Sequence, residues 1–218
     1  MKRNPISSVI RLFETNPFGI ALWMIFQGLV GRMIDLIMAY LLTAPGLHLG
    51  PGCRIVGGRH ISLGRSIYAH RDLWLEAVTS YHLQMFRPEI AIGDHVSFSD
   101  GVHISAINSI EIGNYVLFGS RIYVSDHNHG VYKGDQQSRP DEAPSHRILG
   151  GGGPVTIGDN VWIGDNSVII GPVSIGNGSI IGANSVVRGV IPPNSIAAGT
   201  PAKLIKVFNP QTGQWDRA

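Results

Sequence analysis

The sequence predicts a parallel β-helix, an all-β solenoid of short strands joined by tight turns. From residue 157 to residue 187 an aliphatic residue returns at every sixth position without a slip: Ile157, Ile163, Ile169, Ile175, Ile181 and Val187. An amphipathic helix repeats its apolar residues every 3.6 positions and a half-buried strand every second position, so neither accounts for a period of six. Strict short repeats are typical of β-helices, where each repeat buries its apolar face only by stacking on the next.

The residues between the aliphatic positions suit the corners of such a solenoid. Glycine directly follows four of the aliphatic residues, at Gly158, Gly164, Gly176 and Gly182. Glycine and asparagine supply the left-handed backbone that a tight corner needs. If three repeats close one triangular coil, Ile175 stacks on Ile157. A looser version of the same repeat runs through residues 49–124, interrupted at 71–89, where we expect a strand near Trp74 and then a protruding loop.

At these motifs the sequence resembles the hexapeptide-repeat acyltransferases. The resemblance rests on the motif IGDNVWIG at 157–164, on IPPNSIAAGTPAK at 191–203, and on SDHNHG at 125–130. The last motif looks like the branch that O-acetylates sugars of surface polysaccharides and lipopolysaccharide. The resemblance covers roughly residues 47–208 and implies a left-handed β-helix. It also implies transfer of an acetyl group from acetyl-CoA to a sugar hydroxyl.

Length and composition bound the organisation of the chain. The 218 residues accommodate one solenoid domain with a short extension. We divide them into an apolar helical extension at 1–46, a β-helix domain at 47–208 with a loop at 126–153, and a tail at 209–218 that is either disordered or strapped onto a neighbour. Only 15% of residues are charged and the net charge is +2, which does not indicate a nucleic-acid partner. The single cysteine, Cys53, fits a reducing compartment and is expected to pack in the core.

The apolar run at 18–44 is long enough to span a bilayer. Gln27, Arg32 and Asp35 interrupt it, and charges at mid-membrane are costly. We expect one or two helices that stop at Pro45-Gly46. Three roles stay open: packing against the solenoid end or a neighbouring subunit, an anchor lying on the membrane, or a single span. No cleavage site follows a short apolar core, so we expect a cytoplasmic protein, in contact with the inner face of the membrane if the anchor reading holds.

The interruption at 126–153 begins with the one tight cluster of titratable side chains in the sequence. A long excursion from a regular solenoid calls for a function, because loops on rigid scaffolds often carry chemistry. A sugar hydroxyl is a poor nucleophile at neutral pH, and an imidazole can take its proton as it attacks a thioester. We predict His127 as this general base, in a direct ternary-complex mechanism, with Asp126 or a backbone carbonyl holding its tautomer. Ser125 lies too close in sequence to act as a positioned nucleophile, and no nucleophile-elbow motif is present.

Four further residues are candidates for binding the acceptor sugar. Asn128 and His129 follow the predicted base, and Asp100 and His103 lie in an earlier repeat where the resembling family places polar acceptor-binding residues. The alternative for Asp100 and His103 is that they are solvated corner residues.

The resemblance also implies how the donor binds. In that family acyl-CoA lies in a groove between two adjacent β-helices, so the resemblance implies a homotrimer with each site at a subunit boundary. The residues that correspond to this groove are Trp162, Gly164, Asp165, Gly182, Ala183, Arg188, Gly189, Lys203 and Lys206. Arg188-Gly189 stands where the family often has Thr-Lys, so the basic residue is displaced by one position.

Three other functions share this type of scaffold. The first is N-acylation of an amino sugar or nucleotide-sugar, which would also use a histidine base. The second is a metal-dependent carbonic anhydrase of the gamma type, in which His103, His127 and His129 would be the ligands. Their spacing does not resemble that family, and we expect no metal. The third is a solenoid without catalytic activity.

Overall fold

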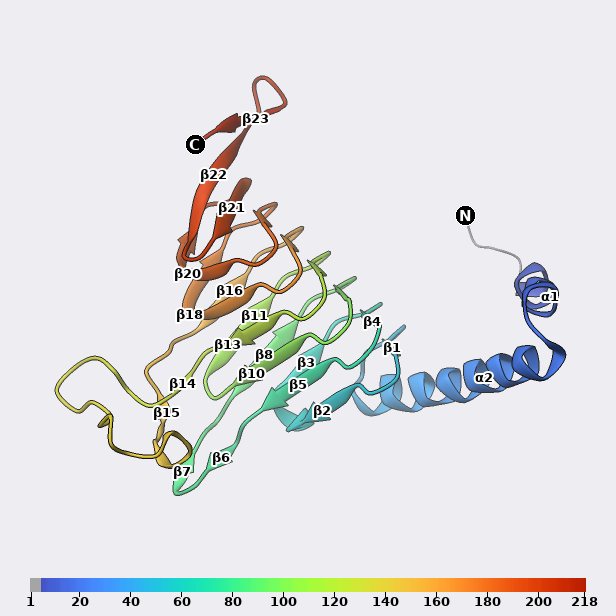
Figure 1. Ribbon diagram of the computed structural model, residues 1–218, viewed down its shortest axis with the longest axis horizontal. Helices are drawn as coiled ribbons and strands as arrows, with labels where there is room; N and C mark the ends of the chain where they lie inside the picture. The colour runs from blue at the N-terminus through green and yellow to red at the C-terminus, as the bar shows by residue number, and fades with distance from the viewer. Residues whose placement is uncertain (1–4) are drawn as a thin grey trace.

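The computed structural model describes residues 5–218, and residues 1–4 of the predicted extension lie outside it. It shows a tapering stack of short parallel strands with two helices at one end and a β-hairpin at the other (Figure 1). The helices are α1 (Pro5–Thr15) and α2 (Phe18–Leu41). The strands form three faces of a prism, as the repeat of six predicts.

Each face is a column of strands that pair in parallel with the strands of the coils before and after them. Face 1 consists of β1 (His48–Leu49), β4 (Tyr68–Ala69), β9 (Ser97–Phe98), β12 (Leu117–Phe118), β17 (Trp162–Ile163), β19 (Ile180–Ile181) and β21 (Ser195–Gly199). Face 2 consists of β2 (Arg54–Val56), β5 (Trp74–Ala77), β10 (His103–Ala106), β13 (Tyr123–Ser125) and the start of β18 (Val168–Ile175). Face 3 consists of β3 (Ile61–Leu63), β8 (Glu89–Ile92), β11 (Ser109–Ile112), β16 (Val155–Ile157) and the end of β18. Strand β20 (Val186–Ile191) pairs with both parts of β18.

The register confirms the predicted stacking of the aliphatic residues. Ile157 pairs with Ile175, Ile163 with Ile181, and Ile169 with Val187. All six side chains are buried. The corners behave as expected, since Asn160, Asn166 and Asn184 have φ angles of 58°, 57° and 57°. Asparagine tolerates this left-handed conformation better than most residues, because its short polar side chain can hydrogen-bond locally.

The end of the chain folds back on the solenoid. Strand β22 (Ala202–Asn209) runs antiparallel to β21, and β23 (Gln214–Arg217) runs antiparallel to β22. Phe208 and Trp215 pack across this hairpin with ring centroids 5.3 Å apart. The tail at 209–218 thus forms the turn and second strand of a hairpin with β22.

Two corners of the prism matter for the site, and we call them edge 1 and edge 2. Edge 1 joins face 1 to face 2 and carries residues 50–52, 70–72, 100–101, 120–121, 165–166 and 183–184. Edge 2 joins face 2 to face 3 and carries residues 126–127, 171–172 and 188–189. Both large insertions leave the prism at edge 2. They contain the hairpin β6 (Ser80–Tyr81) and β7 (Gln84–Met85), and the pair β14 (Asn128–His129) and β15 (Leu149–Gly150). Figure 1 shows the two insertions lying together.

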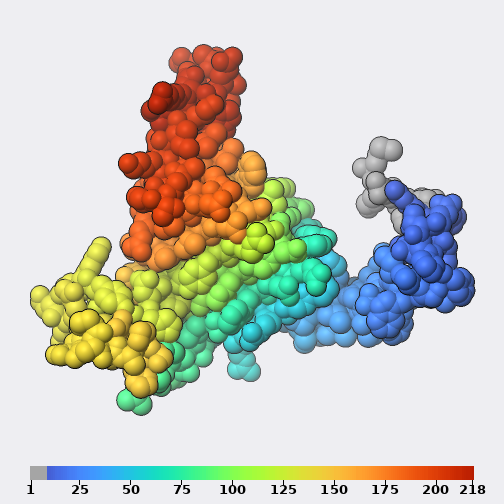
Figure 2. Space-filling view, viewed as in Figure 1, coloured from blue at the N-terminus to red at the C-terminus, as the bar shows by residue number. Residues whose placement is uncertain are grey.

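Helix α2 contacts the prism only near its C-terminal end. Met38, Ala39 and Leu42 pack against the core of the first coil. The Asp35 carboxylate accepts a hydrogen bond from the backbone N–H of Leu49 at 2.8 Å and lies 2.7 Å from His48 Nδ1. The rest of α2 projects away from the prism (Figure 2). By length and composition α2 could cross a membrane, and Ala21 is its one buried residue. The helix thus caps the solenoid end as one reading predicts, but most of its apolar surface is left uncovered.

Candidate functional site

Asp126 and His127 are in direct contact at edge 2, directly after β13 ends. The Asp126 Oδ1 atom lies 2.9 Å from His127 Nδ1. The same carboxylate accepts hydrogen bonds from the backbone N–H groups of Ile107 at 2.9 Å and Asn108 at 2.7 Å. Asp126 is fully buried, so these bonds compensate for its removal from water. With Nδ1–H donated to Asp126, the His127 lone pair is on Nε2, the atom that a general base must present.

Ser125 faces His127 on the Nδ1 side of the imidazole, away from the Nε2 atom that a base would use. Its Oγ atom is 3.3 Å from His127 Nδ1 and donates a hydrogen bond to the His127 carbonyl at 2.9 Å. Ser125 is fully buried and His127 is 8% exposed. The hydroxyl thus shapes the turn and has no access to a substrate, which agrees with our rejection of a serine nucleophile.

Gly152 lets the returning strand of the 126–153 loop pass close to this pair. A Cβ atom at Gly152 would overlap the carbonyl group of Asp126. The next residue, Gly153, donates its backbone N–H to that carbonyl at 2.9 Å. The backbone on both sides of Asp126 is therefore fixed by neighbouring segments.

His103 lies on the outer side of face 2 in a column of aromatic and charged residues. Its ring stacks on Trp74 with centroids 4.0 Å apart, and the Arg54 guanidinium lies 4.5 Å from the Trp74 ring centre. Burial lowers the pKa of His103, and the charge of Glu76, 3.7 Å from Nε2, opposes this shift. His103 Nε2 and Trp74 Nε1 are buried without a hydrogen-bond partner among the described residues. Such atoms are rare in folded proteins, which makes this part of face 2 a candidate for contact with a polar group.

Asn128 and His129 lie in β14, beyond the end of β13. His127 and His129 are two residues apart in the sequence but do not share a strand. His127 is buried at the corner, whereas His129 is in a separate strand, is exposed, and lies with Nδ1 3.4 Å from the hydroxyl of Tyr81. In the described part of the chain no group of three His, Cys, Asp or Glu residues is arranged to hold a metal ion.

A clamp between the two insertions was not visible in the sequence. Gln84 bonds both backbone groups of Leu149: its amide donates to the carbonyl at 3.0 Å and its Oε1 accepts from the N–H at 2.7 Å. The Tyr81 hydroxyl donates to the Ser145 carbonyl at 2.6 Å, and His82 Nε2 lies 2.8 Å from the same oxygen. The hairpin at 80–85 thus holds the far end of the loop that starts at His127. Such pairing over more than sixty residues leaves no local signal in a single sequence.

The predicted donor residues and Asp100 share edge 1. Gly164, Asp165, Gly182 and Ala183 form successive corners of this edge, with Trp162 on the strand before them. Asp165 Oδ1 accepts from the backbone N–H of Ser120 at 2.7 Å. One coil below Ser120 lies Asp100, whose Oδ1 is 2.6 Å from His70 Nδ1. Asp100 is therefore next to the donor residues and is separated from His127 by the width of face 2.

The remaining predicted donor residues lie elsewhere. Arg188 and Gly189 are exposed on edge 2, in the coils above His127. Lys203 and Lys206 are exposed on β22, and neither these lysines nor Arg188 has a carboxylate partner among the described residues. The predicted site is thus divided between two edges of one prism. A single chain does not bring both halves together.

The clamp yields a first prediction. Replacing Gln84→Ala removes both bonds to the Leu149 backbone, and the loop at 130–150 should then open more often. We expect faster hydrogen exchange at the Leu149 amide and faster proteolytic cleavage within the loop, by roughly tenfold for a loss of about 1.4 kcal/mol. Met85→Ala, an exposed neighbour on the same hairpin, is the matched control and should leave both rates unchanged. Equal rates in all three proteins would contradict the clamp.

Comparisons with known proteins agree with this architecture. The family model described as "Bacterial transferase hexapeptide (six repeats)" matches residues 154–189. WbbJ of Escherichia coli strain K12, named as a candidate O-acetyl transferase of lipopolysaccharide biosynthesis, is 44% identical over 133 residues, which are 61% of this chain and 67% of WbbJ. A candidate acetyltransferase of Staphylococcus haemolyticus strain JCSC1435 is 59% identical over 56 residues, 26% of this chain and 29% of that protein.

Among solved structures the fold is similar to AntD, an N-acyltransferase from Bacillus cereus crystallised with dTDP and Coenzyme A. The TM-score is 0.60 at 19% identity, covering 78% of this chain and 84% of AntD, a likeness that concerns the fold. WbbJ shares 44% identity over two thirds of its own length, which is enough to establish kinship. The chain belongs to the hexapeptide-repeat acyltransferases, with their left-handed parallel β-helix as its fold.

Proposed function

We propose that this protein transfers an acetyl group from acetyl-CoA to a hydroxyl of a sugar used to build a surface or exported polysaccharide. The observation that carries the proposal is the buried Asp126–His127 pair, which leaves Nε2 of the imidazole as a base. The choice of a hydroxyl acceptor rests on the similarity to WbbJ.

In this mechanism His127 Nε2 removes the proton of the acceptor hydroxyl as its oxygen attacks the thioester carbonyl. The resulting imidazolium is stabilised by the Asp126 carboxylate, which the N–H groups of Ile107 and Asn108 hold in place. His127 then returns the proton to the departing thiolate, so no covalent enzyme intermediate is needed. General-base catalysis of this type contributes about 10²- to 10⁴-fold to the rate.

We assign the acceptor to the space around His127. Asn128 and His129 extend from the base along β14, and His129 is positioned against Tyr81. His103 contributes Nε2, which has no close hydrogen bond and lies 3.7 Å from Glu76, on the neighbouring face, and burial lowers its pKa in favour of the neutral ring. A neutral imidazole can accept or donate one hydrogen bond, as recognition of a sugar hydroxyl requires. Asp100 lies on edge 1, so in this assignment it reaches the acceptor from a neighbouring subunit.

We propose that the active protein is a homotrimer whose sites lie between subunits. The separation of the two edges supports this, because edge 1 of one prism can face edge 2 of the next only if copies lie side by side. CoA would then lie against Trp162, Gly164, Asp165, Gly182 and Ala183 of one copy. These include small corner residues that allow close approach of a thin pantetheine arm. Arg188, Lys203 and Lys206 have no carboxylate partner among the described residues and suit its phosphates, with Gly189 beside Arg188.

The proposed base is tested by thiol release from acetyl-CoA in the presence of a panel of sugars. We expect His127→Ala to lower sugar-dependent release by a hundredfold or more. The control is His95→Asn, which replaces an exposed histidine at a different corner with a residue that tolerates its φ of 58°. Release that survives the loss of His127 would reject it as the base. A wild-type protein that acetylates only amino sugars would overturn O-transfer in favour of N-acylation.

Mixed trimers test the shared site. We expect His127→Ala and Ala183→Trp to be inactive alone, because one removes the base on edge 2 and the other obstructs edge 1. If each site draws one edge from each of two subunits, random equimolar trimers regain about a quarter of wild-type activity. A mixture of His127→Ala with Asp126→Asn is the matched control, since both defects lie on edge 2 and no intact site can form. A first mixture that stays as inactive as this control would contradict the shared site.

We also propose that the protein works in the cytoplasm on the inner face of the membrane. Support comes from α2, whose first fourteen residues, 18–31, carry no charge and whose large apolar side chains are mostly exposed. The full chain should float with phospholipid vesicles, and Leu29→Glu should weaken its partition at least about tenfold, since a charge within the bilayer costs more than 1.4 kcal/mol. Leu83→Glu, an equally apolar exposed site on the β6–β7 hairpin, should have no effect. Equal flotation of both variants would reject the helix as the contact.

A further inference from the structure

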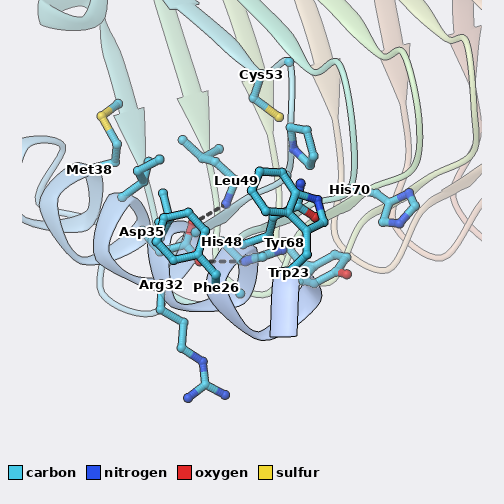
Figure 3. A pocket seen from close by; sticks show the side chains of 18 residues that line it. Trp23, Phe26, Arg32, Asp35, Met38, His48, Leu49, Cys53, Tyr68 and His70 are labelled. Atoms are coloured by element: carbon cyan, nitrogen blue, oxygen red, sulfur yellow. Dashed lines mark hydrogen bonds and ion pairs between the residues drawn. The ribbon is translucent and has the colours of Figure 1, made fainter. Parts of the chain in front are cut away.

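A groove of about 1170 Å³ lies between α2 and the first two coils (Figure 3). Trp23, Phe26 and Met38 line it from the helix, and Leu49 and Tyr68 line it from the strands of face 1. None of the residues assigned to catalysis or donor binding lines this groove. The groove is open to solvent and is large enough to hold part of an organic ligand, since sites that enclose one have volumes of about 300–1,000 Å³.

The groove changes from apolar to polar along its length. Its outer part, away from the prism, is formed by Trp23, Phe26 and Val30. Its inner part contains the Asp35–His48 pair at 2.7 Å and ends at His70. Arg32 lines the groove from α2 between these parts, with its guanidinium directed away from the Asp35–His48 pair (Figure 3), and it has no carboxylate partner among the described residues. A molecule that matches this gradient has an apolar chain at one end and an anionic group next to it.

Two glycines line the groove, although no contact or backbone conformation within the chain requires glycine at either position. Gly28 and Gly31 line it from α2, and an added Cβ atom at either position would meet nothing within 4 Å. Glycine within a helix is destabilising by about 0.5–1 kcal/mol relative to alanine. Both residues have negative φ, so neither the backbone conformation nor a crowded neighbour requires glycine. Larger side chains at these two positions would fill the groove.

The polar end of the groove leads onto edge 1. Cys53 and His70 line the groove, and His70 is paired with Asp100 in the following coil. Asp100, Ser120, Asp165 and Ala183 then follow one another along this edge. Coils are spaced by about 4.8 Å, so the first coil and the coil of His127 are roughly 14 Å apart along the axis. A headgroup leaving the groove therefore points toward the proposed donor residues.

We propose that the groove binds the lipid of a lipid-phosphate-linked sugar, which is the acceptor of the transfer reaction. The apolar chain lies along the stacked rings of Trp23 and Phe26, the phosphate lies within reach of the Arg32 guanidinium, and the sugar extends along edge 1 to the shared site. This inference rests on the proposed function, since it names the class of its acceptor. Under this proposal α2 has a role beyond attaching the protein to the membrane, because the surface of α2 that lines the groove also selects the substrate.

Binding is tested with farnesyl phosphate on the full chain, below the concentration at which the lipid forms micelles. We expect saturable binding of one molecule per subunit, measured by calorimetry and by the tryptophan fluorescence of the chain, in which Trp23 is one of four tryptophans. The double variant Gly28→Leu/Gly31→Leu fills the groove while favouring the helix, and it should weaken binding at least tenfold. Gly19→Leu is the matched control, because it makes the same change on the same helix outside the groove and should leave the affinity unchanged.

The groove would be rejected as the lipid site if the wild type shows no saturable binding. It would also be rejected if the double variant and Gly19→Leu weaken binding equally, or if both bind as tightly as the wild type. A change of oligomeric state in the double variant alone would assign the groove to a helix of a second copy and also overturn the proposal. Thiol release with a water-soluble sugar separates this failure from failure of the proposed function. Wild type and double variant should release thiol equally with that sugar, whereas absence of release in both would count against the reaction itself.

Discussion

The hydrogen bonds between successive coils are the constraint on which the rest of this structure depends. The N–H of Gly158 bonds the carbonyl of Ile175, and that of Gly164 bonds the carbonyl of Ile181, at 2.9 and 2.8 Å. Buried backbone groups must be paired, so each strand is held in register with the coil on either side. A slip of one residue would turn every inward side chain to the solvent. Extra residues can therefore enter only at corners, and both large insertions leave at edge 2.

Asp126 shows how the fold and the chemistry share one residue. Where the chain departs into its long loop, the N–H groups of Ile107 and Asn108 face the side chain of Asp126, and its carboxylate accepts from both. The same oxygen that receives the Ile107 N–H also lies against His127 Nδ1. The orientation of the proposed base is thus tied to the pairing of buried backbone groups. Because such groups are costly to leave unpaired, the imidazole is held without any contribution from a substrate.

The sequence predicted what depends on local period, and it missed what depends on distant pairing. The stacking of Ile157 on Ile175 and the left-handed asparagine corners follow from a repeat that can be counted directly. The contact of Asp126 with His127 is also local. By contrast, the position of Asp100 on edge 1 could be assigned only by knowing which residues before and after it belong to insertions and which belong to the coils. The clamp of Gln84 on Leu149 depends on two insertions meeting in space, which no periodicity encodes.

The two ends of the prism differ in chemistry, so edge 1 is lined by different kinds of residue at its first and last coils. At the first coil the edge begins beside an apolar groove and the Asp35–His48 pair. At the last coils it carries small corner residues and lies near the exposed cations of β22. A lipid-borne acceptor and a phosphate-rich donor therefore suit opposite ends of the same edge. They can approach along one line without competing for space, and the acetyl group needs to move only where they meet, at the height of the coil that carries His127. In the proposed reaction, the length of the solenoid between groove and donor residues would determine how far the sugar extends from its lipid.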